Sequence, residues 1–134
     1  PMEKRIEIPV MENAQLGMSV GMALMGKVVI SIFPRFDFLL CAVDSLVNTL
    51  DKLEEFTHGE YHAKVIIRVG IGSTSPMYPG VQHCGDYTNV FRKLLHSITV
   101  IKLGEQMGAL EAYLQAYVSR GSTLIVENLG KYGD

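Results

Sequence analysis

Five short apolar runs rich in β-branched residues alternate with helix-like segments along the chain, and this alternation limits the possible folds more than any other feature. The predicted strands are residues 5–8, 27–33, 63–69, 97–103 and 122–128. The central runs are apolar at successive positions, so both faces of these strands are expected to be buried. The sequence therefore predicts an α/β fold in which a mostly parallel five-stranded sheet carries helices on both faces.

The segments between these strands have helical patterns. Helices are predicted over residues 13–25, 37–57, 86–96 and 105–119. The first ends at Gly26, and the second has an apolar stripe at three- and four-residue spacing behind Asp37, a suitable N-cap. A glycine-, serine- and proline-rich loop over residues 70–85 follows the third strand.

The length of 134 residues suits a single domain over residues 1–134. The net charge of −2 gives no reason to expect nucleic acid or an anionic membrane as a partner. Glycines and Lys27 interrupt the longest apolar stretch, residues 16–33, so no transmembrane span is predicted. Cys41 and Cys84 lack metal-ligand spacing and no signal peptide precedes them, which together suggest a reducing, cytoplasmic setting.

Glu12 is the first candidate site residue. In sheets of this class ligands bind beyond the carboxyl ends of the strands, and Glu12 lies just after the first predicted strand. One interpretation is a first-turn carboxylate that interacts favourably with the helix dipole. The other is a proton-exchanging carboxyl that apolar neighbours, including Met11 and Leu16, shield from water.

Three further features follow other strands or lie in the first helix. Gly17 and Gly21 clear one helix face for a close contact, within the domain or across a dimer. Phe36 and Phe38 follow the second predicted strand, either as core residues or as a stacking surface for a flat heterocycle. His83 closes the long loop and is either structural or a proton-shuttling group.

Metal binding is not predicted. His58 and His62 could share one helix face, but Gly59 between them disfavours a helix there, and no third ligand is evident. Cys84 adjoins His83, yet adjacent side chains point apart, which disfavours a thiol nucleophile. No nucleophile elbow or phosphate-binding loop supports an esterase or a nucleotide-binding protein.

Several motifs occur in the same order and at about the same separations as in a known enzyme family. They are P-V-M-E-N-A-x-L-G-x-x-V-G-x-A-L-x-G, F-x-F-x-x-x-A-V-D-x-L-V-N, Arg68 in a strand, G-V-Q-H and V-E-N-x-x-x-Y-G. Together they resemble the pyrimidine-binding domain of thiamine-diphosphate enzymes over most of the chain. The resemblance is closest to the beta subunit of the decarboxylating component of 2-oxo acid dehydrogenases, such as pyruvate dehydrogenase.

The resemblance implies roles for the candidate residues. Glu12 corresponds to the glutamate that contacts the pyrimidine ring nitrogen and favours the imino tautomer used in cofactor activation. Phe38, with Phe36 as a further candidate, corresponds to the aromatic wall against that ring, and His83 to the histidine that handles protons near the thiazolium. The helix with Gly17 and Gly21 corresponds to one at the family's subunit interface, which implies a homo- or hetero-oligomer.

The resemblance also implies a partner. Family members carry a strand and helix before the segment that resembles residues 5–8, so the chain is expected to be truncated at its N-terminus. The magnesium- and diphosphate-binding motif, Gly-Asp-Gly followed by Asn, does not occur in this sequence, and neither does a C-terminal transketolase-like domain. An alpha-type subunit or domain is therefore expected to supply magnesium and the diphosphate contacts.

The implied function is the aminopyrimidine half of a thiamine-diphosphate site for 2-oxo acid decarboxylation or acyl transfer. The alternative is a non-catalytic remnant or interaction module that keeps the fold and the dimer-forming helix without cofactor turnover.

Overall fold

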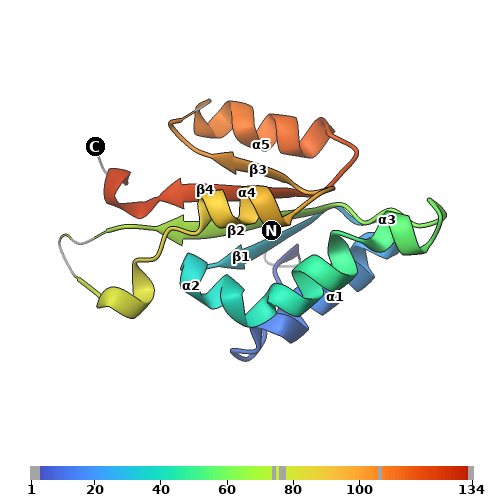
Figure 1. Ribbon diagram of the computed structural model, residues 1–134, viewed down its shortest axis with the longest axis horizontal. Helices are drawn as coiled ribbons and strands as arrows, with labels where there is room; N and C mark the ends of the chain where they lie inside the picture. The colour runs from blue at the N-terminus through green and yellow to red at the C-terminus, as the bar shows by residue number, and fades with distance from the viewer. Residues whose placement is uncertain (1–3, 74, 76–77, 106, 133–134) are drawn as a thin grey trace.

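The computed structural model describes residues 4–73, 75, 78–105 and 107–132. These residues form an α/β fold with a four-stranded, all-parallel sheet in the order β1-β2-β4-β3 (Figure 1). The strands are β1 (Val29–Phe33), β2 (Val65–Ile71), β3 (Thr99–Lys102) and β4 (Thr123–Asn128). The predicted α/β class and the parallel arrangement are confirmed.

The α-helices are α1 (Glu12–Leu24), α2 (Phe36–Leu39), α3 (Leu53–Phe56), α4 (Thr88–Leu94) and α5 (Ala109–Val118). Shorter or wider helical turns are η2 (Leu40–Ala42), η3 (Ser45–Leu50), η4 (Val81–His83) and η5 (Leu129–Lys131). Positions 74, 76 and 77 of the predicted loop and position 106 of the predicted last helix lie outside the described residues.

Helices cover both faces of the sheet, as predicted. One face packs against α1, the helical segment 36–56 and α4, and this layer contains the larger core, with Leu16, Phe36 and Phe91 among its buried side chains. The other face packs against α5, where Ala116 contacts the small cluster around Ile66 and Ile125. Successive side chains of a strand point to opposite faces of the sheet. In β2 and β4 the side chains on both faces are mostly apolar, which accounts for this two-sided burial.

The predicted first strand is not present. Residues 5–8 form no strand in the structure, so the sheet has four strands rather than the predicted five. This segment offers only two apolar side chains, Ile6 and Ile8, between charged residues, and Ile6 is exposed. A strand of this kind needs a sheet neighbour to satisfy its backbone, and the described residues supply none beside it.

The predicted helix over residues 37–57 is broken into α2, η2, η3 and α3. The π-helical turn η3 is followed by Asp51, whose buried carboxylate accepts hydrogen bonds from the backbone N–H groups of His96, Ser97 and Ile98. These contacts connect the helical layer to the start of β3. The break in the helix thus places the Asp51 carboxylate beside the residues that lead into β3. The helical sequence pattern alone did not predict this contact.

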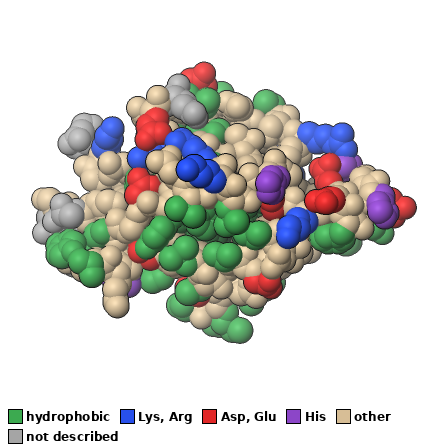
Figure 2. Space-filling model, viewed as in Figure 1, with side chains coloured by type: hydrophobic (Ala, Val, Ile, Leu, Met, Phe, Trp, Pro, Cys, Tyr) green, Lys and Arg blue, Asp and Glu red, His purple; other side chains and the backbone are tan. Residues whose placement is uncertain are grey.

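Hydrophobic side chains are also visible on the outer side of the helical layer. Figure 2 shows them gathered around α4 and the helical segment 36–50, and Leu40, Val90 and Leu94 are the exposed large hydrophobic residues of these elements. Among the described residues, no helix is both long enough and apolar enough to cross a bilayer.

Candidate functional site

The candidate site lies at the carboxyl edge of the sheet. In Figure 1 the strands point toward the side where α2 and η4 lie. The first turn of α1 reaches the same edge, because the side-chain amide of Gln15 donates to the hydroxyl of Ser31 at 3.1 Å and to the carbonyl of Ile32 at 2.9 Å, near the end of β1. The segments that carry Glu12, Phe38 and His83 therefore belong to one edge, as parallel topology requires.

Phe38 and His83 are in contact. Their ring centroids lie 5.3 Å apart with an interplanar angle of 52°. Both side chains are partly exposed. The Nδ1 atom of His83 is buried and has no hydrogen-bond partner among the described residues. A buried ring nitrogen that is left unpaired costs free energy, so a rearrangement that gave this atom a hydrogen-bond partner would be favourable.

Asp37 holds the loop that carries His83. One carboxylate oxygen of Asp37 accepts a hydrogen bond from the backbone N–H of Gly85 at 3.2 Å, and the other accepts one from the hydroxyl of Tyr87 at 3.1 Å. The hydrogen bond raises the pKa of the Tyr87 hydroxyl, and burial acts in the same direction. Sequence reasoning treated Asp37 as an N-cap, whereas its side chain positions the loop after η4.

Phe36 and Phe38 have different environments. Phe36 is fully buried, edge to face with Tyr87 at 5.6 Å between centroids and tilted against Phe91 at 5.0 Å. Its ring therefore belongs to the core in this conformation and leaves no face for a ligand. Phe38 keeps part of its surface open, so it is the aromatic side chain of the pair that a ligand could contact.

Glu12 is the first residue of α1 and is partly buried. It has no hydrogen-bond or ion-pair partner in the part of the chain that the structure describes. Its neighbour Asn13 accepts hydrogen bonds through its side-chain oxygen from the backbone N–H of Ser45 at 3.2 Å and from the Ser45 hydroxyl at 2.6 Å. Glu12 thus lies beside the helical segment that carries Phe38, but no direct contact joins it to Phe38 or His83.

A polar cluster that sequence reasoning missed lies on the α5 face of the sheet. The Arg68 guanidinium contacts the Glu127 carboxylate at 2.6 Å through Nε and through Nη2, and Nη2 also donates to the Tyr132 hydroxyl at 2.7 Å. Tyr113 donates to Glu127 at 2.6 Å, and Tyr132 donates to it as well. The sequence signal that could have indicated this cluster was a single charged residue in each of two otherwise apolar strands, Arg68 in β2 and Glu127 in β4.

The electrostatics of this cluster favour an ionised Glu127. Its side chain is only 8% exposed, and burial alone raises the pKa of a carboxyl group. The hydrogen bonds from Tyr113, Tyr132 and Arg68 outweigh burial, so the Glu127 pKa lies below its ordinary value. Burial and the hydrogen bond to Glu127 raise the pKa of Tyr113. The four side chains supply hydrogen-bond partners to one another, so we interpret the cluster as structural.

The glycines of α1 leave an open surface. A Cβ placed at Gly17 or Gly21 would meet no atom within 4 Å, so neither glycine serves a close contact within the described chain. Met18 is exposed on the same helix, and so is Met25 immediately after it. Of the two explanations for the glycine spacing, contact within the domain finds no support among these residues.

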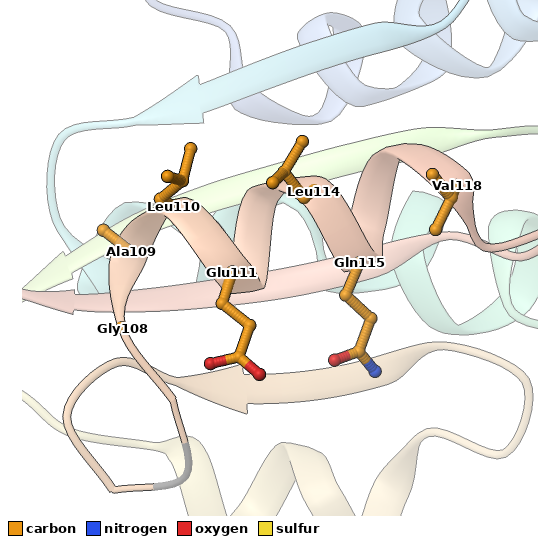
Figure 3. A pocket seen from close by; sticks show the side chains of 7 residues that line it. All are labelled: Gly108, Ala109, Leu110, Glu111, Leu114, Gln115 and Val118. Carbon is orange, nitrogen blue, oxygen red and sulfur yellow. The ribbon is translucent and has the colours of Figure 1, made fainter.

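A second apolar surface lies along α5, on the opposite side of the sheet from α1. Figure 3 shows Leu110, Leu114 and Val118 in a row along one side of the helix, with Glu111 and Gln115 on another side. All three apolar side chains are more than half exposed. The surface is shallow and contains none of the sequence-predicted site residues, so it does not change the location of the candidate site.

Groups of three or more metal-ligating side chains do not occur among the described residues. The ring of His62 pairs with the Glu54 carboxylate at 2.7 Å, and His58 lies in a turn with a φ of 52°. Comparison of the chain with protein-family models and with curated proteins gives no match.

Proposed function

We propose that this chain supplies the aminopyrimidine half of a thiamine-diphosphate site for 2-oxo acid decarboxylation or acyl transfer, and that a partner chain completes the site. The observation that carries the proposal is the contact between Phe38 and His83, with their rings 5.3 Å apart at the carboxyl edge of the sheet. The same two residues are those for which the sequence resemblance implies a packing wall and a proton-handling group.

The residues present fit one end of such a cofactor. Phe38 offers a partly exposed aromatic face for a flat heterocycle, and the partly exposed imidazole of His83 lies beside it as a hydrogen-bonding group. Glu12 opens α1 at the same edge, with its carboxylate free of ion pairs to the other described residues. A site for an aminopyrimidine requires an aromatic wall, a hydrogen-bonding ring nitrogen and a carboxyl group. Phe38, His83 and Glu12 supply these three side-chain types.

Each residue has a separate task in this proposal. The Glu12 carboxyl group shares a proton with a ring nitrogen of the heterocycle. This role requires that water be excluded from the carboxyl group, either by the bound cofactor or by a partner chain. Phe38 fixes the plane of the ring, and His83 transfers a proton at the substrate end of the site. When bound, thiamine diphosphate would supply a carbon nucleophile for chemistry at the carbonyl group of a 2-oxo acid.

The proposal requires a partner subunit or domain because the diphosphate and magnesium motif does not occur in these 134 residues. An alpha-type subunit or domain holds both groups, and the oligomer forms through the exposed face of α1 around Gly17 and Gly21. The open space beside these glycines supports this contact, because a second helix can approach the backbone there closely. The partner also covers Met18 and Met25.

We include the pyrimidine-domain fold in the same proposal. The four parallel strands correspond to the part of that fold after its first strand and helix. In family members a further strand precedes the segment that resembles residues 5–8. Residues 5–8 become a strand, in this proposal, only when such a neighbour is present.

The second candidate is an interaction module without cofactor turnover. The observation that favours it is the separation of Glu12 from the pair formed by Phe38 and His83, since no contact joins them. In this alternative the exposed α1 face is the functional surface. Cofactor binding in the presence of a partner distinguishes the two candidates.

The test is calorimetry with thiamine diphosphate and Mg²⁺, on the chain alone and on its mixture with chains that carry the Gly-Asp-Gly…Asn motif. We expect weak or no binding to the isolated chain and tight binding to an assembled complex. A complex that forms through α1 and yet binds no cofactor would establish the interaction module instead.

A further inference from the structure

Both cysteines of the chain belong to the segments that meet at the candidate site. Cys41 lies in η2, directly after α2, and Cys84 directly follows η4. Both are free thiols; Cys41 is exposed and Cys84 is partly exposed. Neither thiol has a place in the proposed chemistry of the site, so their position there needs a separate explanation.

Two contacts determine where Cys84 lies. His83 packs against Phe38, and the backbone N–H of Gly85 donates to Asp37 at 3.2 Å. Cys84 stands between these two residues in the sequence, so its backbone faces the part of α2 that carries Asp37 and Phe38. Consecutive residues are only about 3.8 Å apart, which leaves Cys84 little freedom to lie elsewhere.

The helical geometry places Cys41 on the same side. Successive helical residues rotate by about 100°, so Cys41 projects between the directions of Asp37 and Phe38, one turn further along. This is the direction of the loop that both residues contact. The Cys84 backbone and the Cys41 side chain are therefore brought to the same side of one helix, separated along its axis by about one turn of roughly 5 Å.

From this placement we propose that Cys41 and Cys84 form a reversible disulfide that acts as a redox switch on the candidate site. Each thiol loses one proton and one electron as the S–S bond forms. The oxidant, a peroxide or a small-molecule disulfide, takes up both electrons and both protons and yields water or two thiols. In a reducing compartment such a bond is transient, which is typical of regulatory disulfides.

The cross-link changes the site because the cysteines are offset by a helical turn. A disulfide holds its two Cβ atoms about 3.8 Å apart, so the loop must shift along the helix toward Cys41. Gly80 and Gly85 flank the shifting segment and provide backbone freedom. His83 moves with the loop and leaves Phe38. This consequence for activity rests on the proposed function, whereas formation of the disulfide does not.

The test measures disulfide exchange of the isolated chain with a series of glutathione redox buffers, in native buffer and in urea. Peptide mass spectrometry after alkylation of the remaining thiols quantifies the Cys41–Cys84 link. We expect the equilibrium to favour the link at least about tenfold more in the native chain than in urea, because the fold gathers the thiols. Cys41→Ser and Cys84→Ser are the controls, and each should abolish the link.

A native equilibrium equal to or less favourable than that in urea would overturn the proposal, because the fold would then hold the thiols apart. Mixed disulfides with glutathione as the only native products would overturn it equally. In an assembled, active complex, oxidation should reduce turnover of the parent chain but not of Cys41→Ser. If the link forms and turnover is unaffected, its regulatory role is wrong, whereas an inactive complex with a normal link would count against the proposed function alone.

Discussion

The imidazole of His83 and the ring of Phe38 lie 5.3 Å apart, although they come from helical segments that follow different strands. Phe38 follows β1, and His83 follows β2. Because adjacent parallel strands end at the same edge, the segments after them meet there. The Asp37 carboxylate accepts hydrogen bonds from Gly85 and Tyr87, which hold the two segments together. The helix that carries Phe38 therefore positions the loop that carries His83.

Substitutions of the two phenylalanines should differ in their effects on stability and on cofactor binding. Phe36→Ala removes a fully buried ring from the core and should lower the free energy of unfolding by about 3–5 kcal/mol. Phe38→Ala removes a partly exposed ring and should cost about 1–2 kcal/mol. In an assembled complex, Phe38→Ala should weaken thiamine-diphosphate binding about tenfold. Urea denaturation and calorimetry measure these effects, and unchanged cofactor affinity would remove Phe38 from the site.

Glu127→Gln should destabilise the fold at neutral pH. The substitution removes the charge that three donors satisfy and leaves Arg68 without its carboxylate, so we expect a loss of about 2–4 kcal/mol in the free energy of unfolding. The matched control is Glu105→Gln, which removes an exposed carboxylate bound to Lys102 and Arg92 and should cost much less. Equal effects of the two substitutions would contradict the structural role of the cluster.

The same variant should change the acid dependence of stability. The pKa of Glu127 is lower in the folded chain than its ordinary value of 4.5, so its stabilising contribution is fully present above that pH. The contribution is lost as the pH falls through the lower folded pKa. The difference in unfolding free energy between parent and Glu127→Gln should therefore be constant near neutral pH and shrink in acid. A difference that grows in acid would show the opposite pKa shift.

Gly21→Ala should stabilise the isolated chain. Position 21 lies inside α1 with no atom within 4 Å of an added Cβ, so alanine gains helix propensity of about 0.5–1 kcal/mol without a clash. Gly70→Ala is the control, because its Cβ would lie 2.6 Å from the Pro34 carbonyl oxygen and should destabilise the fold. Thermal unfolding measures both, and destabilisation by Gly21→Ala would indicate a contact that the monomer does not show.

Gly21→Leu tests the proposed interface. The side chain finds open space in the monomer but occupies the surface that a partner helix needs. We expect an unchanged monomer fold and loss of assembly by sedimentation or light scattering. Assembly that is as tight as that of the parent would place the interface elsewhere.

The strand pattern made most of the fold predictable. The apolar runs that became β1, β2, β3 and β4 each pair with at least one neighbouring strand, and Gly26 and Pro34 flank β1 in the sequence. Residues 5–8 have a strand-like pattern as well, but the sequence does not show whether a neighbouring strand exists. Strand formation there depends on pairing rather than on local preference.

The site was predictable to a lesser extent. The resemblance indicated Phe38 and His83, and the structure brings them together. The cluster around Arg68 and Glu127 was not predicted because it depends on the register of β2 and β4, which sets Arg68 opposite Ile125 and Glu127 opposite Gly70. Strand register is a tertiary property that a single sequence does not determine.

Turnover of the assembled complex with Glu12→Gln tests the central claim most directly. The substitution keeps the size of the side chain and removes its capacity to share a proton, while Glu7→Gln, on an exposed residue before α1, serves as the control. We expect Glu12→Gln to lower 2-oxo acid decarboxylation by at least about 100-fold in a complex that assembles normally, and Glu7→Gln to have no effect. Full activity of the Glu12→Gln complex would contradict the account.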